Sequence, residues 1–158
     1  MSSRKRARTA AASRAPKRPI SKELVAISKT GTAATQATTT LYTATFPVTV
    51  VGMRWALSFI QDAGTGACNV WWAIVVVRDG ITVSTVAISD AAAFFEPEQD
   101  VLAFGNALID NNTTPPRDMG ASKTMRKLQT GDRLVFIDRG VATDTHATTG
   151  IVQFFVKA

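Results

Sequence analysis

Apolar and polar residues alternate along most of the chain after residue 36, as they do in β-strands that bury one face. The segment VVGMRWALSFI (residues 50–60) shows this most clearly, because every second side chain from Val51 to Phe59 is large and apolar. The segment VWWAIVVV (residues 70–77) is apolar on both faces, which is typical of a central strand. Turn residues separate such segments roughly every eight to twelve residues, a spacing typical of a β-sandwich or barrel.

This pattern predicts eight strands and almost no helix. The strands are expected at residues 37–47, 50–60, 70–78, 81–88, 100–108, 122–129, 132–139 and 149–157. Asp79-Gly80 and Thr130-Gly131-Asp132 predict hairpin turns, and the Pro-Pro segment at residues 110–120 predicts a polar loop. We therefore expect an all-β fold, a single eight-stranded antiparallel jelly-roll sandwich. An immunoglobulin-like sandwich is the competing arrangement, and periodicity does not choose between the two.

Residues 1–35 differ in composition and predict a disordered arm in front of a shell domain that spans residues 36–158. Residues 1–29 contain nine Lys or Arg and one Glu (9 − 1 = +8), whereas residues 30–158 contain nine basic and eleven acidic residues (9 − 11 = −2). The arm has little to bury, and its Arg-rich clusters suit salt-dependent contacts with phosphates that have no sequence preference. We expect nucleic-acid binding by these arm residues: Arg4, Lys5, Arg6, Arg8, Arg14, Lys17 and Arg18.

A second basic cluster lies within the domain, in KTMRKLQ and at the start of RLVFID. It consists of Lys123, Arg126, Lys127 and Arg133. These residues are either a second surface for nucleic acid or ordinary strand-edge charges that block edge-to-edge pairing. The sequence favours neither interpretation over the other.

Few residues have the chemistry for catalysis, so we expect no enzyme and no cofactor. His146 is the only histidine and lies in a polar segment, TDTHATTG, without a neighbouring nucleophile, which predicts a solvated loop histidine. Cys68 is the only cysteine, so the chain cannot form an internal disulfide. It lies in a Gly-rich segment that predicts a turn. One Cys and one His also cannot supply the usual ligands of a zinc site, and we expect no metal.

Carboxylates and apolar runs give weaker signals. Glu96, Glu98 and Asp100, or Asp110, could supply oxygen ligands to calcium between subunits, but solvated acids are the simpler interpretation. The longest apolar run, residues 70–77, is far shorter than the ~20 residues of a membrane helix, so no membrane partner is expected. No apolar segment follows the basic start, as a secretory signal would require.

Aromatic residues are numerous for a domain of this size: Trp55, Trp71, Trp72, Phe94, Phe95, Phe154 and Phe155. Adjacent aromatics on a strand point to opposite faces, so one member of each pair must leave the interior. Such a side chain either stacks on a base or is buried at a subunit interface. The interface is favoured, because interfaces use Trp and Phe as anchors, and this predicts a protein that assembles.

The chain resembles a known family in the order of its segments. An Arg-rich arm is followed by FFEPEQDVLAFG, then KTMRKLQTGDRLVFI and a terminal GIVQFFVKA. Together they are similar to the capsid proteins of circular Rep-encoding single-stranded (CRESS) DNA viruses, in particular small nanovirus- and circovirus-like members. The resemblance implies a jelly roll and a sixty-subunit icosahedral (T=1) homo-oligomer that packages circular single-stranded DNA with its arm. It also implies location in the virion, passage through the host nucleus, and recognition of the arm by a nuclear import receptor.

Alternatives from other classes remain open at this point. A jelly-roll coat protein of a small RNA or satellite virus has the same composition, since a basic arm contacts only phosphates. A cellular module that binds single-stranded nucleic acid would be a monomer or small oligomer with a five-stranded barrel. The Arg-, Ser- and Ala-rich start also resembles a mitochondrial presequence, although Pro16 and Pro19 would interrupt its amphipathic helix.

Overall fold

The computed structural model describes residues 19–32, 36–63, 67–82, 100–110, 115–140 and 145–158. Within these segments the chain forms nine strands: β1 (Ile20–Thr32), β2 (Ala37–Thr43), β3 (Val48–Ala63), β4 (Cys68–Val77), β5 (Asp100–Ile109), β6 (Arg117–Ser122), β7 (Arg126–Leu128), β8 (Arg133–Gly140) and β9 (Thr145–Lys157). No helix in the described segments could cross a membrane.

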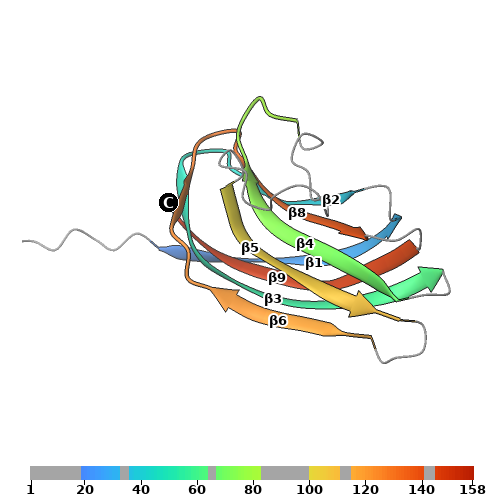
Figure 1. Cartoon of the computed structure of the whole chain (residues 1–158). Helices are drawn as coiled ribbons and strands as arrows, with labels where there is room; N and C mark the ends of the chain where they lie inside the picture. The colour runs from blue at the N-terminus through green and yellow to red at the C-terminus, as the bar shows by residue number, and fades with distance from the viewer. Residues whose placement is uncertain (1–18, 33–35, 64–66, 83–99, 111–114, 141–144) are drawn as a thin grey trace, which may run out of the picture.

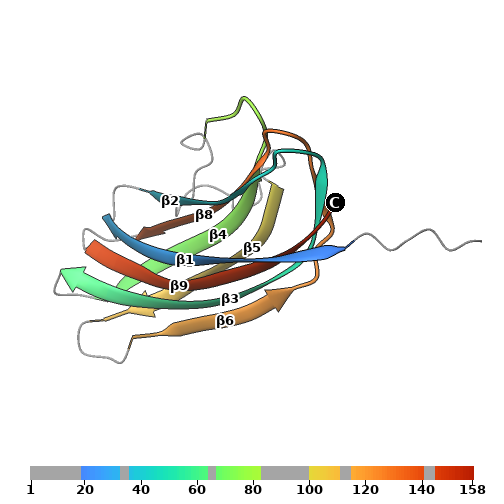
Figure 2. The same ribbon diagram turned by 180° about the vertical axis from the view of Figure 1, so that it is seen from behind.

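The strands form two antiparallel sheets that pack face to face, so the all-β sandwich expected from the sequence is confirmed (Figure 1). Sheet A has the order β1-β9-β3-β6, and the short strand β7 pairs with β3 beside β6. Sheet B has the order β2-β8-β4-β5. Figure 2 shows β1, β9 and β3 of sheet A in front of the strands of sheet B.

The core lies between the sheets and is built from one face of each strand. Trp72 of β4 is completely buried, meets Trp55 of β3 edge to face at 5.4 Å, and stacks on Phe136 of β8 at 6.2 Å. Phe154 of β9 lies 5.7 Å from the ring of Tyr42. Aromatic contacts of this kind add to the apolar area that the two sheets bury.

Strand β4 is apolar on both faces, as the sequence predicts, because its second face also belongs to a buried cluster. This cluster lies on the outer side of sheet B and contains Ala73, Val75, Val77, Val135 and Ile137. Trp71 and Trp72 accordingly point to opposite faces, and Trp71 packs against this outer cluster. The expectation that one member of each aromatic pair leaves the sandwich interior is confirmed at this position.

The disordered arm predicted for residues 1–35 is wrong for residues 20–32, which form β1. This strand pairs with β9 from Ile20 opposite Lys157 to Thr32 opposite Thr145. Its apolar signal is weak because β1 is an edge strand that adds little to the core, mainly Ile27 and the partly buried Val25. Residues 1–18, with all the predicted arm contacts, lie outside the described residues.

The nine observed strands also differ from the eight predicted ones at residues 81–88 and 122–129. Residues 81 and 82 are not in a strand, and the remainder of the first segment lies outside the described residues. The second is divided into β6, which begins at Arg117 inside the predicted polar loop, and β7. Both strands pair with β3, so a single edge position of sheet A is filled by two short pieces.

The turn at Thr130-Gly131-Asp132 is not a hairpin between neighbouring strands. It connects β7 in sheet A to β8 in sheet B, and the chain therefore crosses from one sheet to the other. The Asp132 amide donates to the Gln129 carbonyl at 3.1 Å, and Gly131 adopts a φ of 91° that favours glycine. A turn signal in the sequence shows where the chain reverses but does not show which sheet the next strand joins.

Candidate nucleic-acid interface

The four basic residues predicted within the domain do not form one cluster. Lys123 and Lys127 are exposed, and Lys127 lies on the outer side of β7. Arg126, its neighbour on the strand, points to the opposite side and forms an ion pair with Asp100, Nε to Oδ1 2.5 Å. Arg133 donates to the carbonyl oxygen of Ile81 at 2.6 Å. Two of the four cations are therefore engaged in contacts within the domain.

Arg126 belongs to an ion-pair network that ties the ends of several strands together. Arg78, at the end of β4, contacts Asp100 at 2.9 Å and Asp132 at 2.8 Å. Burial by itself would raise the pKa of Asp132, but hydrogen bonds from the Gln129 and Asp79 amides and from Arg78 outweigh it and hold that pKa below its usual value. Asp100 pairs with both Arg78 and Arg126, and we therefore interpret it as a structural ion-pair partner. No group of three or more candidate metal-binding side chains occurs in the described segments, and Glu96 and Glu98 lie outside them.

The outer face of sheet A collects a different set of basic residues. We define this face by the side chains that point away from the core, which the register aligns in rows across the sheet. One row runs Ile20–Lys157–Thr49–Lys127, and another runs Leu24–Gln153–Arg54–Ala121. Lys22 lies between these rows on β1, and Arg117 lies farther along on β6.

This face is positively charged. Its five exposed cations are Lys22, Arg54, Arg117, Lys127 and Lys157. No acidic residue accompanies them among the side chains described on the face, although the domain as a whole has more acidic than basic residues. A surface with this separation of charge attracts polyanions.

Sequence reasoning named only Lys127 from this set, because the other four are isolated cations within separate strands. Arg54 alternates with the large apolar residues of the segment 50–60, which predicts that it faces away from the core but not what lies beside it. Strand pairing brings Arg54 next to β9, whose sequence lies about a hundred residues later. Parity along the predicted strands could have placed Arg54, Lys127 and Lys157 on the outer sides of their strands, but only the sheet order shows that these sides coincide. Lys22 and Arg117 lie outside the predicted strands.

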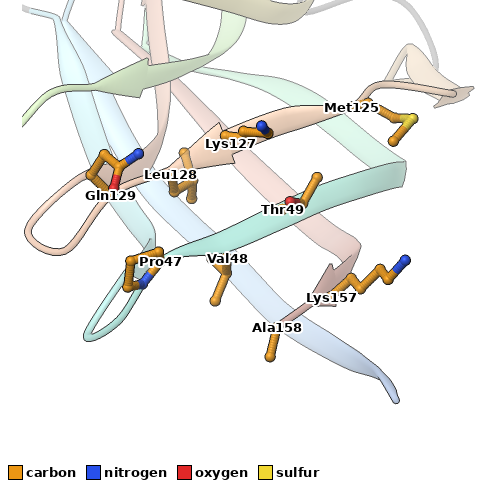
Figure 3. A pocket seen from close by; sticks show the side chains of 9 residues that line it. All are labelled: Pro47, Val48, Thr49, Met125, Lys127, Leu128, Gln129, Lys157 and Ala158. Atoms are coloured by element: carbon orange, nitrogen blue, oxygen red, sulfur yellow. The ribbon is translucent and has the colours of Figure 1, made fainter. Parts of the chain in front are cut away.

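One end of this face contains a cleft of about 380 Å³ between the β3 entry, β7 and the end of β9 (Figure 3). Lys127 and Lys157 are two of its lining residues, with Thr49 between them in the same row. The first residue of β1, Ile20, pairs with Lys157, so β1 begins beside this cleft. The described chain therefore starts at the same end of sheet A as the two lysines of the cleft.

The solvated loop expected for His146 is wrong, since this residue is completely buried in β9. Its Nε2 lies 3.0 Å from Oδ2 of Asp138, and the Thr148 hydroxyl donates to the same oxygen at 2.5 Å. Asp138 and Thr148 are also completely buried. The segment TDTHATTG has polar residues at consecutive positions, which suggested a loop, but two of its inward side chains form a polar cluster with Asp138 of β8 inside the sandwich. Since a buried cluster gives no access to a substrate, it supports a packing role.

Cys68, which the sequence places in a turn, is also buried and lies at the start of β4.

A second polar contact joins the sheets near β6. Asp118 accepts hydrogen bonds from two indole nitrogens, Trp55 Nε1 to Oδ1 at 3.0 Å and Trp72 Nε1 to Oδ2 at 2.9 Å. Gly105 of β5 leaves room for this arrangement, because a Cβ there would lie 2.7 Å from the carboxylate and from the Trp72 indole. The carboxylate thus connects one strand of each sheet to β6.

Comparison with known proteins gives little further information. No protein-family model and no curated protein matches the chain. Among solved structures, the Eiger TNF from S. frugiperda is similar over 86% of this chain and 93% of its own, with 12% identity and a TM-score of 0.38.

Proposed function

We propose that this protein is a viral capsid protein whose sandwich is the shell domain and whose basic arm binds the packaged genome. The observation that carries the proposal is the place where β1 begins. Residues 1–18, with seven Lys or Arg and no acidic residue, precede Ile20 at the start of this edge strand, and the outer face of its sheet has five cations. A shell that encloses nucleic acid needs phosphate contacts on its inner side, and the outer face of sheet A brings five cations together on one side of the sandwich.

The strand order supports a jelly roll. The first strand pairs with the last, β1 with β9, and the second pairs with the last but one, β2 with β8. Strands β3 and β4 then extend the two sheets next to β9 and β8. Strands rolled up as nested pairs in this way are the arrangement of a jelly roll, and β6 with β7 together fill one of its eight positions.

The family resemblance in the sequence adds the remaining elements of the proposal. They are a sixty-subunit icosahedral shell, circular single-stranded DNA as cargo, and assembly in the host nucleus after uptake by an import receptor. Partly exposed Trp71 together with the exposed Phe104 and Leu108 on the outer side of sheet B fits a role in subunit contacts, since interfaces use such residues as anchors.

The proposal is tested by expressing the full-length protein and examining it by negative-stain electron microscopy after nuclease treatment. Uniform particles about 20 nm across that retain protected nucleic acid, measured by absorbance at 260 and 280 nm, are the expected result. Extraction and digestion of the cargo with DNase or RNase then distinguishes a DNA virus from an RNA or satellite virus. A small monodisperse species across salt and pH would refute the capsid proposal and favour a nucleic-acid-binding module.

A further inference from the structure

The outer face of sheet A contains one aromatic side chain, Phe155, among the side chains described there. Phe154 points inward and is completely buried, so alternation along β9 places Phe155 outward, where it is partly exposed. Phe155 does not belong to either hydrophobic cluster. Its ring therefore lies outside the packed core, and the part of it that stays exposed is an apolar surface on a charged face.

The cations of this face surround Phe155. Lys22 lies directly opposite on β1, and Lys157 is the next residue on the same side of β9. Arg54 lies on β3, opposite Gln153. With strands about 4.8 Å apart and same-side residues about 6.8 Å apart along a strand, the Cα of Phe155 is about 5 Å from Lys22, about 7 Å from Lys157 and about 8 Å from Arg54.

The residue that faces Phe155 directly from β3 has no side chain. The residue opposite on β3 is Gly52, and a Cβ placed there would meet only the Ser122 carbonyl oxygen, at 3.4 Å, within 4 Å. A partly exposed aromatic ring with three cations near it has the two components that single-strand-binding surfaces combine. These are a stacking platform and positive charges that follow the backbone.

We propose that Phe155 stacks on a base of single-stranded nucleic acid while Lys22, Lys157 and Arg54 hold the flanking phosphates. This inference rests on the proposed function, because it concerns the same nucleic-acid ligand, and it adds a base contact to a phosphate-binding protein. A duplex cannot use this site, since its base faces are covered by their neighbours. The basic segment of residues 1–19 contains no aromatic ring, so it cannot supply an equivalent platform.

The first experiment measures binding of the full-length, nucleic-acid-free protein by fluorescence anisotropy. Two single-stranded probes of equal length are compared, an oligothymidine and an abasic oligonucleotide with the same number of phosphates. The wild type is expected to bind the oligothymidine about five- to a hundredfold more tightly, the range of one stacked base. Phe155→Leu should abolish this preference, whereas Phe155→Tyr should retain it. An oligouridine probe shows whether DNA and RNA are accepted equally.

Matched variants separate stacking from charge. Phe104→Leu makes the same substitution at an exposed phenylalanine on the outer side of sheet B and should leave the preference unchanged. Lys22→Gln and Lys157→Gln should each reduce the slope of log affinity against log salt by about 0.7 and leave the preference for oligothymidine unchanged.

A second measurement uses only the wild-type protein and decides the matter if Phe155→Leu does not fold. Bromouracil-containing single strands are photocrosslinked, and the adduct is located by mass spectrometry, with Phe155 as the expected site. Binding without a preference for bases, a preference that survives in Phe155→Leu, or adducts confined to other residues would each overturn the stacking inference and leave the proposed function intact. Failure of the wild type to bind any nucleic acid would overturn both.

Discussion

Asp118 is the position where a single atom change should have the clearest effect on the fold. In Asp118→Asn one of the two acceptor oxygens becomes an amide, so either Trp55 or Trp72 loses its partner and faces a donor instead. A hydrogen bond to a charged group contributes about 1.5–3 kcal/mol. Because the carboxylate is only partly buried, water compensates for some of this, and we expect a loss of about 2 kcal/mol in the free energy of unfolding.

Such a loss corresponds to a decrease of about 4–8 °C in Tm for a domain of this size. Urea unfolding followed by tryptophan fluorescence measures it directly, since two of the three tryptophans take part in the contact. Glu23→Gln is the matched control, because within the described residues that carboxylate accepts a hydrogen bond only from the nearby Ser21, at the exposed edge of β1. This substitution should change stability by under about 0.5 kcal/mol. If Asp118→Asn is as stable as this control, the indole–carboxylate contacts do not hold the sheets together.

Three further predictions concern packing and pH. Gly105→Ala places a Cβ 2.7 Å from the Asp118 carboxylate and should lower stability by about 1–3 kcal/mol in urea unfolding. Thr148→Val removes the hydroxyl that donates to buried Asp138, and thermal melts should show a loss of about 2–3 kcal/mol. Asp132 has a lowered pKa, so its stabilisation is complete above the ordinary carboxyl pKa of 3.8 and is lost as pH falls through the folded value. The stability difference between the wild type and Asp132→Asn should therefore be constant near neutral pH and shrink in acid; a constant difference down to pH 2 would contradict this.

The fold class followed from the sequence because the central strands have strong local signals. Six predicted strands each correspond to one observed strand, and β4 in particular is apolar on both faces. β1 was missed because its alternation is diluted by Lys22, Glu23 and Lys29, which an edge strand tolerates. β1 is held in the sheet by its pairing with thirteen residues of β9, at the other end of the chain. The local composition of residues 20–32 does not show that this partner exists.

The candidate site was less predictable than the fold for a related reason. Lys127 could be found as part of a local run of charge, but Lys22, Arg54 and Lys157 come from three strands separated widely in sequence. His146 shows the opposite failure, since a polar environment in sequence proved to be a buried polar cluster in space. The missed cations and the buried histidine have the same cause, because the role of each residue depends on which strand lies next to its own.

The attachment of the basic segment through β1 has a mechanical consequence. All 13 residues of β1 pair with β9, and the ladder hydrogen bonds run across the strands. Tension on residues 1–18 directed along β1 therefore loads these bonds together in shear, whereas tension directed away from the sheet would break them one after another from Ile20. The edge strand acts as an anchor whose strength depends on the direction of pull, and a polymer held by the N-terminal segment would be retained most firmly along the axis of β1.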